Sequence, residues 1–220
     1  MKTLLMAVVL SFVLSPGSLL RRNATHLTEN TASKVDVSAR LLLMDTAGFP
    51  AQWNPSENNR AARLTMEAAA KKCTLSLPLP EGAWTLVWQN GLVSNSRGSG
   101  PAVEALLSGV CGLFMAASTP GDTRAELEKF LSALKVSVKT SRLELIEREV
   151  LYALGAAGER TPQYWVGKED FAARGLRWLD ASGVLWELRF KRSESFFREA
   201  ELWREGKMAL KLLADSPKDR

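Results

Sequence analysis

The stretch that decides the fold is residues 162–190, PQYWVGKEDFAARGLRWLDASGVLWELRF. Three short runs rich in aromatic and branched residues lie in it, at 162–166, 175–179 and 184–190, and turn-forming residues separate them. Short strands joined by tight turns are typical of an antiparallel meander, because parallel strands need long crossover connections. The stretch therefore predicts three neighbouring strands of an antiparallel sheet.

Strand-like patterns continue on both sides of this stretch. Residues 135–145 and 147–154 precede it, and residues 196–203 and 207–213 follow it. The last pair has an alternative, one helix over 194–214, against which the glycine near its middle argues. We expect the last eighty-odd residues to form a β meander.

The first half of the chain shows the same kind of pattern. Residues 35–44, 72–77 and 83–89 read as strands, and Asn90-Gly91 is a strong hairpin signal. Residues 61–69 alternate less clearly, and their alanine content leaves strand or helix open.

Two helices are expected between the two strand blocks. Pro101 suits the first position of a helix, and a second helix is predicted over 123–134. The apolar face of the first has spacings of three and four and consists of Val103, Leu106, Leu107, Val110, Leu113 and Phe114. The fold class expected is α+β, mainly antiparallel β.

The N-terminus has the parts of a secretory signal. Lys2 is followed by an apolar run, TLLMAVVLSFVLS, and then by small residues near Ser18. The run is shorter than the roughly 20 residues of a membrane span, so we expect a signal peptide over 1–18 and a periplasmic protein. An uncleaved N-terminal anchor is the alternative.

The mature chain divides simply. Residues 19–34 are polar and are expected to be flexible, residues 35–215 to form one domain, and residues 216–220 to be a polar tail. In an oxidising compartment Cys73 and Cys111 are candidates for a disulfide. Two buried thiols are the alternative.

Composition limits the chemistry. The chain of 220 residues has one histidine, His26, and two cysteines, so a Cys/His zinc site cannot be filled. The formal charge of +5 comes from basic residues interleaved with acidic ones, whereas nucleic-acid binding needs them gathered on one face. We therefore expect no nucleic-acid partner, no metal and no cofactor.

Large aromatic residues gather on the C-terminal strands. They build either a thick core or the wall of an apolar cavity. In the second case the central helices cover the cavity as a lid. The candidates for lining it are Leu106, Val110, Phe114, Trp165, Trp178, Trp186 and Trp203.

Four segments together resemble the periplasmic lipoprotein carriers, the LolA/LolB-like superfamily. These are VSARLLLMDTAG, CTLSLPLPEGAWTLVWQNGLV, the helix ending VCGLF, and the stretch over 162–190. The last matches a strand-turn-strand motif through Pro162, Gln163, Trp165, Lys168 and Asp170. The resemblance implies a curved, incomplete antiparallel barrel covered by helices, with an interior that accepts acyl chains. Arg63 is followed by Leu64 where the family has an Arg-Pro motif, so no lid-contacting arginine is assigned.

Three functions follow, in order of preference. The first is a non-catalytic carrier or sensor that binds the acyl chain of a lipid or lipoprotein, with peripheral contact to a membrane. The second is an envelope interaction module with a filled core and a protein partner. The third, an enzyme, would need paired carboxylates in a shared cleft, and the candidates Glu144, Glu147, Asp170 and Asp180 read as solvated strand and turn residues. We expect no catalytic residues.

Overall fold

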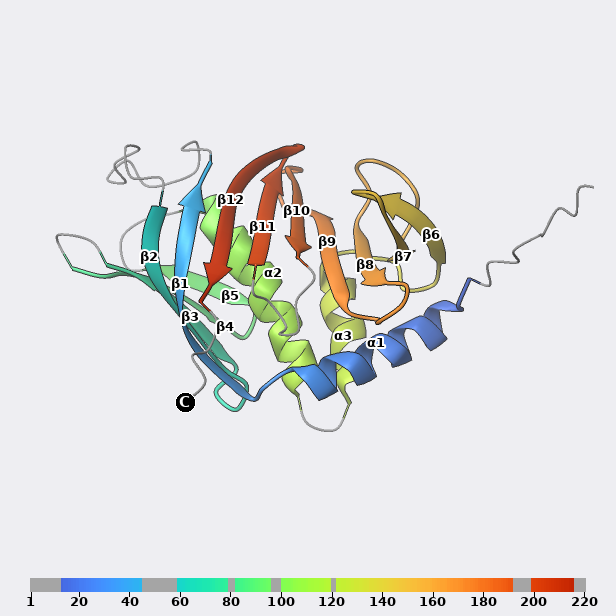
Figure 1. Cartoon of the computed structure of the whole chain (residues 1–220), viewed down its shortest axis with the longest axis horizontal. Helices are drawn as coiled ribbons and strands as arrows, with labels where there is room; N and C mark the ends of the chain where they lie inside the picture. The colour runs from blue at the N-terminus through green and yellow to red at the C-terminus, as the bar shows by residue number, and fades with distance from the viewer. Residues whose placement is uncertain are drawn as a thin grey trace, which may run out of the picture.

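The computed structural model describes residues 13–44, 59–78, 82–95, 100–119, 122–191 and 199–215. These residues form one sheet of twelve antiparallel strands and three helices (Figure 1). The sheet is curved and unclosed, and the helices lie along its concave side, so the predicted fold class is confirmed. Most of the signal-like run and the tail 216–220 lie outside the described residues.

The elements follow one another in two strand blocks around a helical centre. The helices are α1 (Pro16–Asn30), α2 (Pro101–Ser118) and α3 (Thr123–Ala133). The strands of the first block are β1 (Lys34–Leu43), β2 (Asn59–Glu67), β3 (Lys72–Leu77), β4 (Trp84–Gln89) and β5 (Leu92–Asn95). Those of the second block are β6 (Ser141–Ile146), β7 (Glu149–Leu154), β8 (Gln163–Gly167), β9 (Ala173–Leu179), β10 (Leu185–Phe190), β11 (Glu199–Arg204) and β12 (Lys207–Ala214).

The sheet order is β5-β4-β3-β2-β1-β12-β11-β10-β9-β8-β7-β6. Each block is a meander, and the pairing of β1 with β12 joins the two, with Leu41 opposite Leu212. The open edges are β5 and β6, which are the strands before and after the helical centre. The two helices α2 and α3 therefore connect the two edges of the open sheet.

Tight turns set the register of the meander. The turn between β4 and β5 has Asn90 at φ 52° and Gly91 at φ 85°, and that between β11 and β12 has Glu205 at φ 48° and Gly206 at φ 76°. Two successive residues with positive φ make the hairpin turn that matches the twist of the strands. The prediction of separate strands at the C-terminus is confirmed, and the helix over 194–214 is wrong.

Two other sequence patterns are resolved by the structure. Of residues 61–69, those up to Glu67 belong to β2, whose alternating side chains are buried on one face, and the last two begin the turn to β3. The predicted strand 135–145 begins only at Ser141, because Lys135 takes a positive φ of 61° after the end of α3. Lys135 and the residues up to 140 form the turns that lead from α3 to the edge strand.

The segment 19–34 was expected to be flexible, and this is wrong for most of its length. Ser15 caps α1 by accepting a hydrogen bond from the Ser18 backbone N–H, and Pro16 opens the helix. Leu19, Leu20 and Leu27 are fully buried against the core. Because α1 is short of apolar residues elsewhere, its stability comes from this packing.

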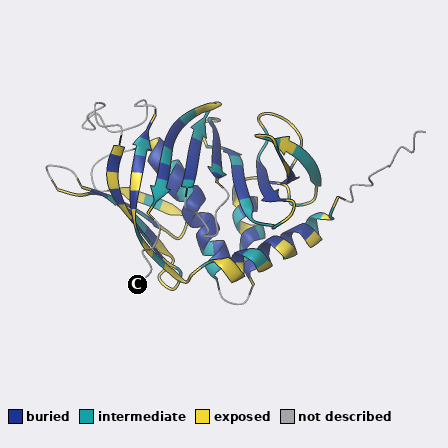
Figure 2. Cartoon of the chain, in the orientation of Figure 1, coloured by how far each residue is buried: buried dark blue, intermediate teal, exposed yellow. Residues whose placement is uncertain are grey.

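Helix α2 is the central element of the core. Its mean hydropathy of 1.5 and its 18 residues would by themselves suffice for a membrane span, and 67% of that window is buried in the fold. An all-round apolar helix is typical of a protein interior. Figure 2 shows the buried residues of α2 beneath the strands, so α2 acts here as the core helix of the sheet.

Candidate functional site

The concave face of the sheet and α2 form one apolar layer. On α2, Leu106, Val110 and Phe114 are buried, and on the sheet Trp178 and Trp186 belong to the same core. The fold thus brings five of the seven cavity candidates to one interior. We take this interior as the candidate site.

Trp165 and Trp203 lie on the opposite, convex face and do not reach this interior. Trp165 forms a separate small cluster with Leu151 and Ala153. The guanidinium of Arg177 lies over the Trp165 ring at 5.1 Å, and that of Arg189 over Trp203 at 4.2 Å. The expectation that all the tryptophans share one wall is therefore wrong for these two.

Strand alternation explains the misplacement. Successive side chains on a strand point to opposite faces, and Tyr164 points toward the helices, so its neighbour Trp165 points away. Trp165 also lies against Gly175, where a Cβ would come within 2.7 Å of the indole ring. Gly175, which faces Trp165 across the register, leaves room for the indole ring on this face.

Close packing fills the middle of the interior. A Cβ at Gly109 would lie 2.7 Å from Leu188 of β10 and 3.5 Å from Trp178 of β9. On its other side, a Cβ at Gly112 would lie 2.2 Å from the ring of Phe130 in α3. These two glycines let α2 lie directly between the sheet and α3, so the site is closed by α2 at this point.

Among the described residues, the polar contacts of α2 with other elements lie near its two ends, apart from the contact between the thiols of Cys111 and Cys73 in its middle. Glu104 in the first turn accepts from Asn95 of β5 at 3.2 Å, and Ser118 at the last residue donates to the Ala32 carbonyl at 3.5 Å. The buried length between them is held by apolar packing. Apolar contacts are not directional, so another apolar group can replace them.

The buried side-chain amide of Asn23 connects helix α1 to the sheet. Asn23 is fully buried, accepts from the Tyr164 hydroxyl at 2.8 Å and donates to the Phe171 carbonyl at 2.7 Å. Burial raises the pKa of Tyr164 well above its usual range, so the hydroxyl stays protonated and donates. The guanidinium of Arg22 lies over the Phe171 ring at 5.1 Å.

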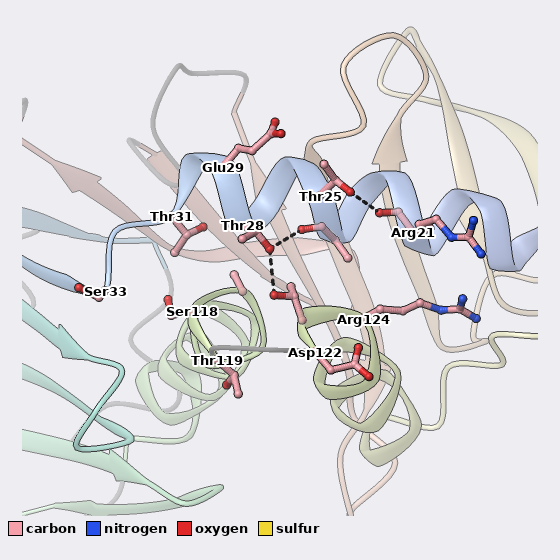
Figure 3. A pocket seen from close by; sticks show the side chains of 13 residues that line it. Arg21, Thr25, Thr28, Glu29, Thr31, Ser33, Ser118, Thr119, Asp122 and Arg124 are labelled. Atoms are coloured by element: carbon pink, nitrogen blue, oxygen red, sulfur yellow. Dashed lines mark hydrogen bonds between the residues drawn. The ribbon is translucent and has the colours of Figure 1, made fainter.

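A pocket of about 480 Å³ lies between α1 and the corner of α2 and α3 (Figure 3). Seven of its thirteen lining residues carry a hydroxyl group, but most of its lining surface is apolar. Thr28 of α1 and Thr123 of α3 share a hydrogen bond of 2.9 Å across one side. Arg21 and Arg124 extend from the two helices in the same direction. The sequence patterns do not indicate this pocket, because they predict a flexible segment where α1 lies.

The carboxylates considered for catalysis have structural partners. Glu144 pairs with Arg142, Glu147 with Arg189 and Asp170 with Arg174. Asp180 caps the turn before β10, accepting from the Ser182 backbone at 2.8 Å and from Trp186 Nε1 at 2.9 Å. Hydrogen bonds from Trp186 and from the turn backbone lower the pKa of Asp180 against the opposing effect of burial.

Cys73 of β3 and Cys111 of α2 are both free and fully buried. The predicted disulfide is absent from the structure, and the alternative of two buried thiols describes them. Burial raises the pKa of Cys111 well above its usual range, and the neighbouring Cys73 thiol raises it further. Among the described residues no three His, Cys, Asp or Glu side chains gather where a metal ion would bind.

Comparison with known proteins gives similarity in structure only. No family model matches the chain, and no curated protein matches it. It is similar to a LolA superfamily protein. That protein, from Nitrosomonas europaea, is 12% identical with a TM-score of 0.48, over 93% of each chain. A DUF1329 family protein from Desulfovibrio piger is 12% identical with a TM-score of 0.42, over 92% of each chain.

Proposed function

We propose that this protein is an exported, non-catalytic carrier that binds the acyl chain of a lipid or lipoprotein between the concave face of the sheet and α2. The observation that carries the proposal is the continuous apolar contact between α2 and the sheet, with polar contacts near the helix ends. An acyl chain that enters this layer gains about 0.8 kcal/mol per methylene removed from water. An acyl chain of ordinary length can therefore compensate for the apolar contacts with the sheet that α2 loses when the acyl chain enters.

The tryptophans provide a direct test, because two lie on each face of neighbouring strands. The probe is a long-chain fatty acid brominated on its chain, which quenches nearby indole fluorescence on contact. The double variant Trp178→Phe/Trp186→Phe removes the two concave-face indoles of β9 and β10 and should lose much of the quenching. The matched variant Trp165→Phe/Trp203→Phe removes two convex-face indoles and should keep it.

Two outcomes of this experiment would contradict the proposal. Equal loss in both variants would show adsorption of the fatty acid to the outside of the molecule, and no quenching of the wild type would show that the interior does not open. Mass spectrometry of lipid extracted from the purified protein tests natural occupancy. Loss of binding without loss of the thermal transition excludes unfolding as the cause.

A second candidate is favoured by the close packing at Gly109 and Gly112, which leaves the middle of the interior filled. In that case the protein is an envelope interaction module with a protein partner and no ligand. Absence of both extracted lipid and fatty-acid quenching, together with co-purification of an envelope protein, selects this function.

Export and a periplasmic location belong to the same proposal. The support is the basic start followed by the apolar run of residues 3–15. Fusion of the first 30 residues to a reporter that is active only after export tests it. An inactive reporter would contradict the location.

A further inference from the structure

The β6–β7 end of the sheet exposes an apolar pair. Leu145 of β6 is 70% exposed and Val150 of β7 is 45% exposed, and the two lie directly opposite each other in the register. β6 is an edge strand of the sheet, and its residues other than Leu145 are of intermediate burial. Directly paired side chains on neighbouring strands form one surface, so Leu145 and Val150 make a small continuous apolar patch, here called the β6–β7 patch.

The β6–β7 patch is continuous with the apolar interior of the molecule. The next cross-strand pair on the same face is Leu143 and Tyr152, and both contact the main core. Tyr152 in turn stacks on Phe171, with ring centroids 6.4 Å apart. The row from Tyr152 through Leu143 to the patch therefore leads from the buried concave face to the open edge.

An arginine without a carboxylate partner among the described residues lies beside the β6–β7 patch. The turn residue Arg148 is exposed, with a φ of 71°, and no carboxylate is paired with it among the described residues. The three nearby glutamates on β6, the turn and β7 are each paired with an arginine. The pairs are Glu144 with Arg142, Glu147 with Arg189 and Glu149 with Arg174. A cation beside exposed apolar side chains is the combination that binds an anionic membrane surface.

The apolar N-terminal run arrives at the same end of the molecule. Ser141, the first residue of β6, donates to the Leu14 carbonyl at 2.7 Å. Val13, just before it, is 47% exposed. In Figure 1 the start of α1 and β6 lie at one end of the molecule. The twelve residues ahead of Val13 are mostly apolar in composition.

We infer that the β6–β7 patch contacts a lipid bilayer, with Leu145 and Val150 inserted among the lipid chains and Arg148 at the anionic headgroups. The inference rests on the proposed function and adds the place at which the molecule meets its lipid. It gives the carrier an orientation in which the apolar row through Leu143 and Tyr152 connects the membrane with the interior.

The experiment uses the full chain and an environment-sensitive fluorophore on a single introduced thiol. Leu145→Cys places the label in the patch, and Leu92→Cys is the matched control, because Leu92 is a leucine of the other edge strand and is 77% exposed. The native thiols are buried and do not compete for the label. The probe is vesicles of phosphatidylethanolamine and phosphatidylglycerol, with and without bromine on the lipid chains.

The label at residue 145 should shift to shorter wavelength with vesicles and be quenched by brominated lipid, and the label at residue 92 should do neither. In addition, Leu145→Ser/Val150→Ser should weaken vesicle partitioning about tenfold, and Leu92→Ser should leave it unchanged. Both positions are exposed, so these variants keep the fold.

Three results would overturn the inference. One is an equal response of both labels, and another is no response at residue 145. The third is a response at residue 145 without vesicles that grows with protein concentration, since this would assign the patch to pairing between two copies of β6. The fatty-acid quenching experiment reports the interior separately, so the bilayer contact and the proposed function can fail independently.

Discussion

Glu205 shows how a single surface side chain ties distant parts of the chain together. From the turn between β11 and β12 it accepts from Arg160 at 2.6 Å and from the Leu185 backbone N–H at 2.9 Å. The Arg160 guanidinium also donates to the Gly183 carbonyl at 2.9 Å. The Glu205 carboxylate and its Arg160 partner therefore connect three segments, which are the loop before β8, the turn before β10 and the turn after β11.

This carboxylate predicts a pH dependence of stability. The hydrogen bond from Arg160, and then that from the Leu185 backbone, lower the pKa of Glu205 from 4.5 to about 2. A lowered pKa in the folded state means that its contribution is complete above pH 4.5 and is lost as the pH falls toward 2. Glu205→Gln should lower Tm by about 1–2 °C at neutral pH, and this difference from the wild type should shrink across that window.

Thermal unfolding followed by circular dichroism at a series of pH values measures this difference. Arg160→Gln removes the same pair and should show the same window. A difference that stays constant down to pH 2 would mean that the Glu205 carboxylate is not the group responsible.

At the scale of the element, α1 is a part of the folded domain whose attachment is concentrated in Asn23. Asn23→Ala leaves the buried Tyr164 hydroxyl and the Phe171 carbonyl without their partner, which should lower the free energy of unfolding by about 2 kcal/mol. Adding Tyr164→Phe should recover part of that loss, because it removes the orphaned hydroxyl. Denaturant unfolding of the single and double variants measures both values.

Thr25 offers the control within the same helix. Its side chain is exposed and donates only to the Arg21 carbonyl of its own helix, so Thr25→Ala should change stability by less than about 0.5 kcal/mol. A loss at Asn23 no larger than that at Thr25 would show that the buried amide does not hold α1 in place.

The elements were predictable where a repeating pattern defines them. The alternation around Cys73 and Leu75, the Asn90-Gly91 turn and the three- and four-residue spacing on α2 each specify local structure, and the strands and helix appear where expected. α1 was missed because its residues are mostly polar. The signal was nevertheless present, since Ser15 and Pro16 form the same small-residue and proline start that indicated α2.

The site was predictable only to the level of composition. The sequence shows that large aromatic residues gather on β8 to β11, and the alternation within each strand decides which face they occupy. Trp165 and Trp178 differ in face because each position is fixed by pairing with its neighbours, as with Trp165 against Gly175. The pocket between α1 and α3 depends on contacts between segments 95 residues apart, such as Thr28 and Thr123, which no local pattern contains.

For the whole molecule, the pairing of β1 with β12 makes one sheet out of two meanders. Leu212 is buried at this junction, opposite Leu41 of β1 and Ala200 of β11. Leu212→Ala should cost about 2–5 kcal/mol through the cavity it leaves. Because both blocks also contact one core around α2, we expect the loss to appear in both halves of the sheet at once.

Hydrogen exchange followed by mass spectrometry tests this expectation. Peptides from β2 to β4 and peptides from β8 to β10 should lose protection together in Leu212→Ala. Loss confined to β10 to β12 would show that the two blocks unfold as separate units.

The joining of the first strand to the last also has a consequence for biosynthesis. β1 is among the first strands to leave the ribosome, and its second neighbour, β12, is the last. During synthesis the free side of β1 stays unpaired, and an unpaired strand edge is a template for aggregation. The free side of β1 is therefore completed only when β12 has been synthesised, and we expect a variant truncated before β12 to expose this edge and to aggregate.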